Sequence, residues 1–237
     1  MKKYLLSSFG SNIVNAIGKI ISFAFLASTL DQTLFSSLMI QITIVEVLAL
    51  CLDFGHSKSI FTHTSNKEDT FFEFCSIFLF KTLILLSLSF ILYSFGFTYL
   101  FWAVPLVLYN FKNFYYDRKF SFKKVLWRNS FDAFLRVIMI FLISSNYNDT
   151  NIILLLFYFP IILIVFYDTV HISLKNKFLK DKFLPEINTR IRKLQYYTKH
   201  GFYPYLDSLM IVILRRGDIF YLNYFLGEII AGQYAAL

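Results

Sequence analysis

The sequence predicts an all-α fold: a polytopic transmembrane helical bundle made of a six-helix N-terminal lobe and the start of a second lobe. Of the 237 residues, 57% are hydrophobic and 16% are charged, whereas soluble domains contain about 50% apolar and about 25% charged residues. Apolar segments close to the ~20 residues that cross a bilayer also recur along the chain, with short polar connections between them. A multi-pass membrane protein explains both observations.

The six predicted spans lie in order at residues 9–30, 34–52, 71–95, 97–111, 125–145 and 152–171. The fourth is the shortest, and we expect its helix to continue towards Tyr116. Pro105 and Pro160 lie inside the fourth and sixth spans, where neighbouring helices can accommodate the kinks that proline introduces.

The connections between the spans alternate in charge, which predicts their orientation. One set carries no Lys or Arg: Asp31-Gln32, the turn near residues 94–96, and Asn146-Tyr147-Asn148-Asp149. The alternate set is basic: Lys2 and Lys3, Lys58 and Lys67, the cluster from Lys112 to Arg128, and the stretch from Lys175 to Lys199. By the positive-inside rule the basic connections and the N-terminus are cytoplasmic.

The chain divides into three predicted units. Residues 1–172 form the six-helix transmembrane lobe. Residues 173–200 are polar and basic, and predict a cytoplasmic linker with an amphipathic helix at the headgroups around 187–197. Residues 201–237 begin a second transmembrane lobe, whose first span is interrupted by Gly201, Pro204 and Asp207. The chain stops inside an apolar, helix-prone run, so we interpret it as a truncated half of a transporter, since such folds often contain two repeated halves.

Arg128, Asp132 and Arg136 recur every four residues and enter the fifth span. On a helix they form one stripe, and Asp132 precedes Arg136 in the favourable orientation for an ion pair. Charge at this depth is costly and usually faces a bundle interior or a water-filled path. Two interpretations stay open: Arg136 supplies positive potential to an anionic substrate, or the pair only fixes helix packing.

Span one carries a polar seam of Asn12, Asn15, Lys19 and Ser22 at steps of three and four residues. Lys19 is too deep for easy snorkelling to the surface, so it should face protein or water. Glu46 in span two is its expected partner. The alternative is that Glu46 is a proton or cation site.

Asp53 shares a helical face with Glu46 and is a second candidate for pairing or ion coupling. Lys81 in span three lies about two and a half turns from the cytoplasmic end, so we expect its side chain to snorkel to that interface.

Signatures of an enzyme, a metal site or a cofactor are missing from the sequence. The four histidines are scattered, no Gly-rich phosphate loop or nucleophile elbow occurs, and the two cysteines suggest no metal site. The net charge of +8 resides mostly between apolar runs, where it meets anionic membrane lipids rather than nucleic acid. Arg216-Gly217-Asp218 matches an adhesion tripeptide, which is short enough to arise by chance and receives no role.

Several short motifs together resemble one family of membrane proteins. Span two closes with Leu52-Asp53-Phe54-Gly55, which looks like an Asp-hydrophobic-Gly turn. The C-terminal part contains Asp218-Ile219-Phe220-Tyr221-Leu222, Phe225-Leu226-Gly227 and Ala231-Gly232-Gln233-Tyr234-Ala235-Ala236. These features resemble the Wzx-type polysaccharide flippases of the multidrug/oligosaccharidyl-lipid/polysaccharide exporter superfamily. The chain departs from that family in length, because its members have about twelve or more helices.

The resemblance implies movement of an undecaprenyl-pyrophosphate-linked sugar repeat, as for O-antigen or capsule, across the bacterial inner membrane by alternating access. Lys19 and Arg136, with Lys81 as a further candidate, would line a cationic cavity that meets the substrate. Glu46, Asp53 and Asp132 would serve in pairing or ion coupling. No catalytic residue or cofactor is required, and other polysaccharide-assembly membrane proteins are expected partners.

Three other functions stay open from the sequence. A multidrug exporter of the same superfamily should contain buried carboxylates more than buried bases. A membrane polysaccharide polymerase should expose a substantial outer loop, whereas the outer connections here are short. A non-transporting assembly or scaffold protein is the alternative that best fits a truncated transporter.

Overall fold

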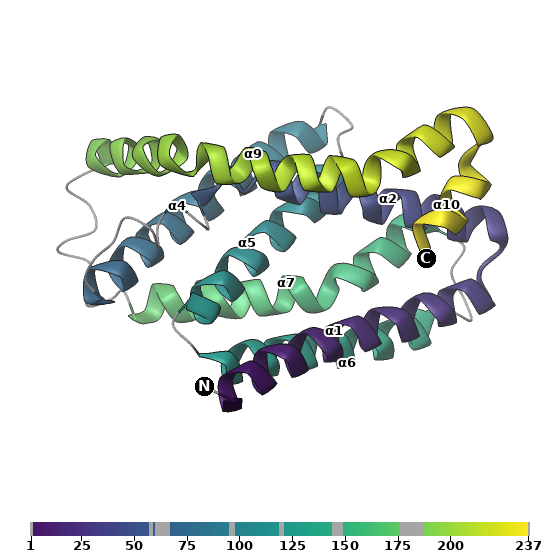
Figure 1. The fold of residues 1–237 in the computed structure, drawn as a ribbon, viewed down its shortest axis with the longest axis horizontal. Helices are drawn as coiled ribbons and strands as arrows, with labels where there is room; N and C mark the ends of the chain where they lie inside the picture. The colour runs from purple at the N-terminus through teal and green to yellow at the C-terminus, as the bar shows by residue number, and fades with distance from the viewer. Residues whose placement is uncertain are drawn as a thin grey trace.

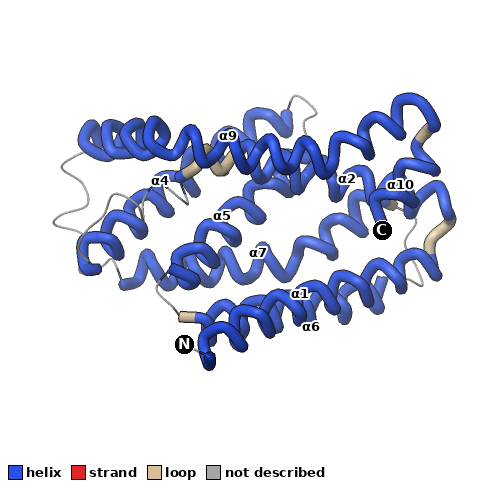
Figure 2. Tube along the Cα trace, viewed as in Figure 1, coloured by secondary structure: helices blue, strands red, loops and turns tan. Residues whose placement is uncertain are grey.

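The computed structural model describes residues 2–56, 59, 67–94, 98–118, 121–143, 149–175 and 187–236. Within these ranges every element is a helix and no strand is present, so the predicted all-α class is confirmed (Figures 1 and 2). The helices are α1 (Lys2–Thr29), α2 (Gln32–Cys51), α4 (Lys67–Ser94), α5 (Thr98–Arg118), α6 (Phe122–Ile143), α7 (Thr150–Lys175), α9 (Ile187–Leu226) and α10 (Glu228–Ala236).

Each of the six predicted apolar segments forms one of the helices from α1 to α7. As expected, α5 continues past Tyr116, and both α5 and α7 run through their internal prolines. Among the described residues, two helices are long and apolar enough to cross a membrane: Gln32–Cys51 and Thr150–Ile172. Two shorter apolar helical stretches, Ile13–Thr29 of α1 and Ile77–Ile91 of α4, also occur among the described residues.

Helix α5 occupies the middle of the bundle and packs against α2, α4, α6 and α7. Its buried side chains include Ala103, Val107, Leu108 and Phe111, which join the apolar residues of its neighbours in one core. The core therefore lies along α5, and the remaining helices are arranged around it (Figure 1).

Helix α1 packs chiefly against α6 and makes few contacts with α2. The approach is close because Gly18 faces Ala133: a Cβ atom at Gly18 would lie 2.5 Å from the Ala133 Cβ. Figure 1 shows the two helices side by side along the lower edge of the molecule. The ion pair between Lys19 and Glu46 is one link from α1 to α2.

Helix α9 runs unbroken for 40 residues, so the interruption expected at Gly201, Pro204 and Asp207 is not present. Proline in a helix removes one backbone hydrogen bond, and here the helix is supported by contact with the end of α2, where the Tyr205 hydroxyl donates to the Cys51 carbonyl at 3.1 Å. The expected linker helix around 187–197 and the expected seventh span thus share one helix. The three-unit division remains a prediction.

Beyond Gly201, α9 is largely exposed; Tyr203, Leu214 and Tyr224 are each about four-fifths exposed. Helix α10 returns against α2 and α9. The Ser36 hydroxyl of α2 donates to the Ile229 carbonyl of α10 at 3.1 Å, and Ala231 is fully buried. Helix α10 is therefore packed against the bundle, whereas much of α9 beyond Gly201 is exposed.

Candidate functional site

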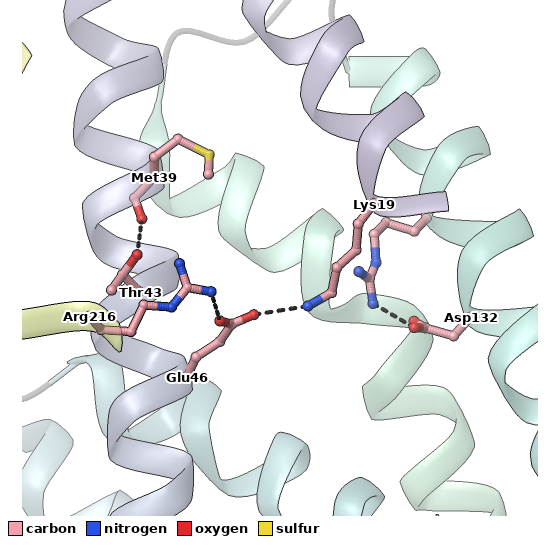
Figure 3. A network of polar contacts seen from close by, with 7 residues as sticks. Lys19, Met39, Thr43, Glu46, Asp132 and Arg216 are labelled. Atoms are coloured by element: carbon pink, nitrogen blue, oxygen red, sulfur yellow. Dashed lines mark hydrogen bonds and ion pairs between the residues drawn. The ribbon is translucent and has the colours of Figure 1, made fainter. Parts of the chain in front are cut away.

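Glu46 lies at the centre of a charged network that joins three helices. Its two carboxylate oxygens accept hydrogen bonds from Lys19 of α1 at 3.0 Å and from Arg216 of α9 at 3.2 Å. Figure 3 shows the two cations approaching Glu46 from opposite sides. The expected pair of Lys19 and Glu46 is present, and α9 adds a second base to it.

The network is partly open to its surroundings. The side chain of Glu46 is 26% exposed, and those of Lys19 and Arg216 are each 38% exposed. These charges lie where α1 and α2 make few direct contacts, so the polar side chains bridge the space between the helices. A partly exposed pair exchanges partners more readily than a fully buried one, since water can stabilise the separated charges.

The local sequence explains how Glu46 is presented. Val45 and Ala49 of α2 are buried in the core, which directs the opposite face of the helix towards α1 and α9. Thr43 keeps its hydroxyl satisfied within α2 by donating to the Met39 carbonyl at 2.9 Å (Figure 3). Because this hydroxyl is bonded within α2, the Glu46 carboxylate accepts its hydrogen bonds from Lys19 and Arg216.

Asp132 and Arg136 form the expected ion pair along α6, with the Arg136 Nη2 2.5 Å from Asp132 Oδ2. Their side chains are 1% and 3% exposed, and the guanidinium lies 4.5 Å from the centre of the Phe157 ring. In Figure 3, Asp132 lies beyond Lys19, on the side away from Arg216. Arg136 thus faces the bundle interior as predicted, enclosed by protein.

The pair is incompletely satisfied. Among the described residues, Asp132 Oδ1 and Arg136 Nε are buried and have no hydrogen-bond partner. A buried charged group whose atoms lack a hydrogen-bond partner destabilises the fold. One acceptor atom and one donor atom near the Glu46 network are therefore left without a hydrogen bond among the described residues.

Arg128, the first member of the predicted stripe, is also buried but does not join Asp132. Its Nη1 pairs with Asp168 of α7, and its Nε donates to Asn113 Oδ1 of α5 at 2.7 Å. The residues of the stripe therefore form two separate interactions. Arg128 connects α6 to α5 and α7, and Arg136 pairs with Asp132 within α6.

The expected snorkelling of Lys81 is wrong. Its side chain is 4% exposed, and its Nζ donates to Asp53 through the backbone oxygen at 2.9 Å and the carboxylate Oδ1 at 3.1 Å. The reason is that α2 ends at Cys51, and the following turn brings Asp53 over α4. Lys81 thus stabilises the turn after α2 through Asp53. It does not take part in the ion pairs of Glu46.

The turn after α2, which carries the Leu52-Asp53-Phe54-Gly55 motif, contacts α9 through glycine. Phe54 and Gly55 have φ of 52° and 72°, and a Cβ atom at Gly201 would lie 2.5 Å from the Gly55 oxygen. His56 Nε2 lies 2.7 Å from the Thr198 hydroxyl of α9. Burial lowers the pKa of His56 to about 3, with the Lys81 charge acting in the same direction, so this contact is made by a neutral ring.

Two charged members of these ion pairs were not predicted from the sequence. Arg216 had been set aside within a chance tripeptide, and Asp168 lies in the otherwise apolar sixth span. A charge inside an apolar run was the available signal for both. Of the predicted seam in α1, Ser22 is buried, while the side chain of Asn12 lies outside the described part of the chain.

The arrangement gathers more bases than carboxylates. Three bases, Lys19, Arg136 and Arg216, accompany the two carboxylates of Glu46 and Asp132. Within the described ranges, no three His, Cys, Asp or Glu side chains are placed to hold a metal ion.

Comparisons of the chain with protein-family models, with curated proteins and with solved structures give no match.

Proposed function

We propose that the protein is a membrane transporter that flips an undecaprenyl-pyrophosphate-linked oligosaccharide, an O-antigen or capsule repeat unit, across the bacterial inner membrane by alternating access. In this proposal α1 to α7 form a six-helix transmembrane lobe with a cytoplasmic N-terminus. Helices α9 and α10 belong to a second lobe.

Support for membrane embedding comes from the apolar residues on the outside of the bundle. Phe90 of α4, Phe134 and Phe141 of α6, and Phe166 of α7 are each at least 65% exposed. Soluble monomers rarely expose contiguous apolar faces of this kind, whereas lipid chains would cover them. The two helices of membrane-crossing length and apolarity agree with this placement.

The observation that carries the proposal is the sharing of Glu46 by Lys19 and Arg216. The two bases come from α1 and α9, which belong to different units of the proposed transporter, and both side chains are 38% exposed. A pyrophosphate could replace the Glu46 carboxylate as the partner of both cations, because phosphate oxygens accept the same charge-assisted hydrogen bonds.

This exchange suggests how binding is coupled to movement. With Glu46 as partner, the two cations connect α1, α2 and α9 directly. With a pyrophosphate as partner, the bases keep their charge neutralised while Glu46 is released, so the contact between the units is mediated by the substrate. A ligand shifts a conformational equilibrium only if it binds the two states differently, and this change of partner provides such a difference.

The other predicted residues take supporting roles in this proposal. Arg136, enclosed with Asp132, adds positive potential behind Lys19 without touching the substrate. Lys81 and Asp53 hold the turn after α2 in place. The excess of bases over carboxylates in the network favours an anionic substrate over the cationic drugs of a multidrug exporter.

The test is flipping of a fluorescently labelled, lipid-linked oligosaccharide by the protein reconstituted in proteoliposomes. We expect Lys19→Gln and Arg216→Gln each to reduce the initial rate by at least about tenfold, because a charge-assisted hydrogen bond contributes roughly 1.5–3 kcal/mol. Lys19→Arg should retain part of the activity, since it keeps the charge.

The matched control is Lys199→Gln, which removes an exposed base on α9 away from the network. It should flip the substrate at the wild-type rate. Wild-type rates in the folded Lys19→Gln and Arg216→Gln variants would refute the proposed site, and absence of flipping by the wild-type protein would refute the function.

A further inference from the structure

A pocket of about 470 Å³ lies between α5, α6 and α7, separate from the Glu46 network. Its charged lining comes from the first turns of α6, with Lys123, Lys124 and Arg128, and from Asp168 and His171 of α7. Lys123 and Lys124 are exposed, whereas Arg128 and Asp168 are buried. The pocket thus has basic residues at its mouth and an ion pair in its wall.

Arg128 retains hydrogen-bonding capacity beyond this ion pair. Its Nη1 is taken by Asp168 and its Nε by Asn113. Its Nη2 is buried and has no hydrogen-bond partner among the described residues, although the residue lines the pocket. A buried donor of a charged group without a partner is costly, which points to an acceptor that the described protein atoms do not provide.

The charges favour an anion. Asp168 neutralises one of the three bases, Arg128, Lys123 and Lys124, and leaves an excess of two positive charges even with His171 neutral. The Lys124 ammonium also lies 5.2 Å from the centre of the Tyr116 ring, which keeps it beside the pocket. Phosphate groups combine the charge and the acceptor oxygens that such a cluster recognises.

The rest of the lining is apolar and aromatic, which indicates what the phosphate is attached to. Trp127, 58% exposed, stacks on Phe131 with 5.3 Å between ring centres. Tyr167 is 61% and Leu163 is 38% exposed. Tryptophan and tyrosine at one level of a helical bundle are typical of the boundary between headgroups and acyl chains. A free phosphate would leave this apolar half of the pocket without a partner.

We propose that this pocket binds the phosphate headgroup of an anionic phospholipid, with Lys123 and Lys124 at the phosphate, Arg128 behind them, and the acyl chains along Trp127 and Leu163. The proposal rests on the membrane placement proposed above but not on transport. The bound lipid would connect α6 to α5 and α7 at their basic end.

Trp127 provides a local probe, because the chain has only one other tryptophan, Trp102, which is 9% exposed in the core. The experiment measures quenching of tryptophan fluorescence by phospholipids brominated near the glycerol end of the acyl chain. It compares brominated phosphatidylglycerol with brominated phosphatidylcholine in vesicles, using the Trp102→Phe protein. If that background loses its helical circular dichroism, the wild-type protein is used, since Trp102 is shielded from lipid.

We expect phosphatidylglycerol to be preferred at Trp127, and the preference to fall by about fivefold for each lysine lost in Lys123→Gln and Lys124→Gln, as a basic residue near an anionic surface contributes about 1 kcal/mol. The matched control removes two exposed bases from α9 instead, Arg192→Gln with Lys199→Gln, and should leave the preference unchanged. Inorganic phosphate should not displace the brominated lipid beyond the effect of potassium chloride at equal ionic strength.

Equal quenching by the two lipids would overturn the proposal. An unchanged preference for phosphatidylglycerol in the Lys123→Gln and Lys124→Gln variants would overturn it as well. Displacement by inorganic phosphate alone would reassign the pocket to a free anion and overturn the lipid. Absence of quenching by either lipid would instead count against the membrane placement on which the proposed function depends.

Discussion

At the scale of single residues, the charges inside the bundle fall into two kinds. Asp132 and Arg136 are almost fully enclosed, whereas Lys19, Glu46 and Arg216 are partly exposed. Removing one member of an enclosed pair leaves an uncompensated buried charge, but removing an exposed partner leaves a charge that water can still solvate. The two kinds should therefore respond differently to the same chemical change.

The enclosed pair predicts a stability effect with a clear sign. Arg136→Gln should lower the free energy of unfolding by about 3–5 kcal/mol because it leaves Asp132 charged and unpaired. The double variant Asp132→Asn with Arg136→Gln should recover most of that loss, since both charges are then absent. Unfolding in mixed detergent micelles, followed by circular dichroism, measures both.

Lys19→Gln is the control, and we expect it to cost no more than about 1 kcal/mol because its partner stays partly hydrated. If Arg136→Gln and the double variant lower the free energy of unfolding equally, the loss does not come from leaving Asp132 unpaired.

At the scale of helices, the attachment of α9 to the rest of the bundle depends on the contact between two glycines. The turn after α2 holds Gly55 in the left-handed region, and the Gly201 backbone lies directly against it. Around this contact, Thr198 and Tyr205 of α9 bond with His56 and with the Cys51 carbonyl. The four groups form one short interface between α2 and α9.

This contact predicts that Gly201→Ala displaces α9. The new Cβ would lie 2.5 Å from the Gly55 oxygen and 2.9 Å from its carbon, and backbone atoms cannot move aside as a flexible side chain can. Overpacking of this kind typically costs about 1–3 kcal/mol. Hydrogen exchange of the α9 backbone should accelerate around residues 198–205.

Gly217→Ala is the matched control, because it lies on the same helix and its Cβ would meet nothing within 4 Å. There alanine should stabilise the helix by up to about 1 kcal/mol through its higher helix propensity. Indistinguishable exchange in the two variants would mean that the glycine contact does not hold α9.

At the scale of the whole molecule, several exposed bases of the described residues lie near one end of the bundle. In Figure 1 the N-terminus and the beginnings of α4, α6 and α9 lie towards the left, whereas the turn between α1 and α2 lies at the right. The first two turns of α6 and α9 carry the exposed Lys123, Lys124 and Arg192, and the turn between α1 and α2 carries Asp31. In the proposed multi-pass arrangement, the positive-inside rule would place this basic end in the cytoplasm.

The predicted topology places Lys67, Lys119 and Lys182 in the cytoplasm and Asp31 and Asn148 outside. Lys119, Asn148 and Lys182 lie outside the described residues, so labelling has to locate them. Single cysteines at these positions, in a chain with Cys51 and Cys75 replaced by alanine, are exposed to a membrane-impermeant maleimide in intact cells. Labelling is expected at positions 31 and 148 only; labelling at 119 with protection at 148 would reverse the arrangement.

The sequence by itself determined the positions of six helices and the local ion pair. Apolar runs of nearly membrane-crossing length predict where each of the six helices lies, since both burial and helix formation depend on composition within one segment. The pair of Asp132 and Arg136 was equally predictable, because a spacing of four residues is a local property of a helix. The pairing of Lys19 with Glu46 followed from the depth of a charge that needs a partner.

Only the tertiary structure decided which distant charges meet. Lys81 binds Asp53 because α2 ends before Asp53 and the turn crosses α4, and Arg216 reaches Glu46 from 170 residues away because α9 continues unbroken past Pro204. Neither fact is contained in the spacing of residues along one segment. Such contacts depend on how whole helices pack, and packing is the joint result of every side chain on the faces that meet.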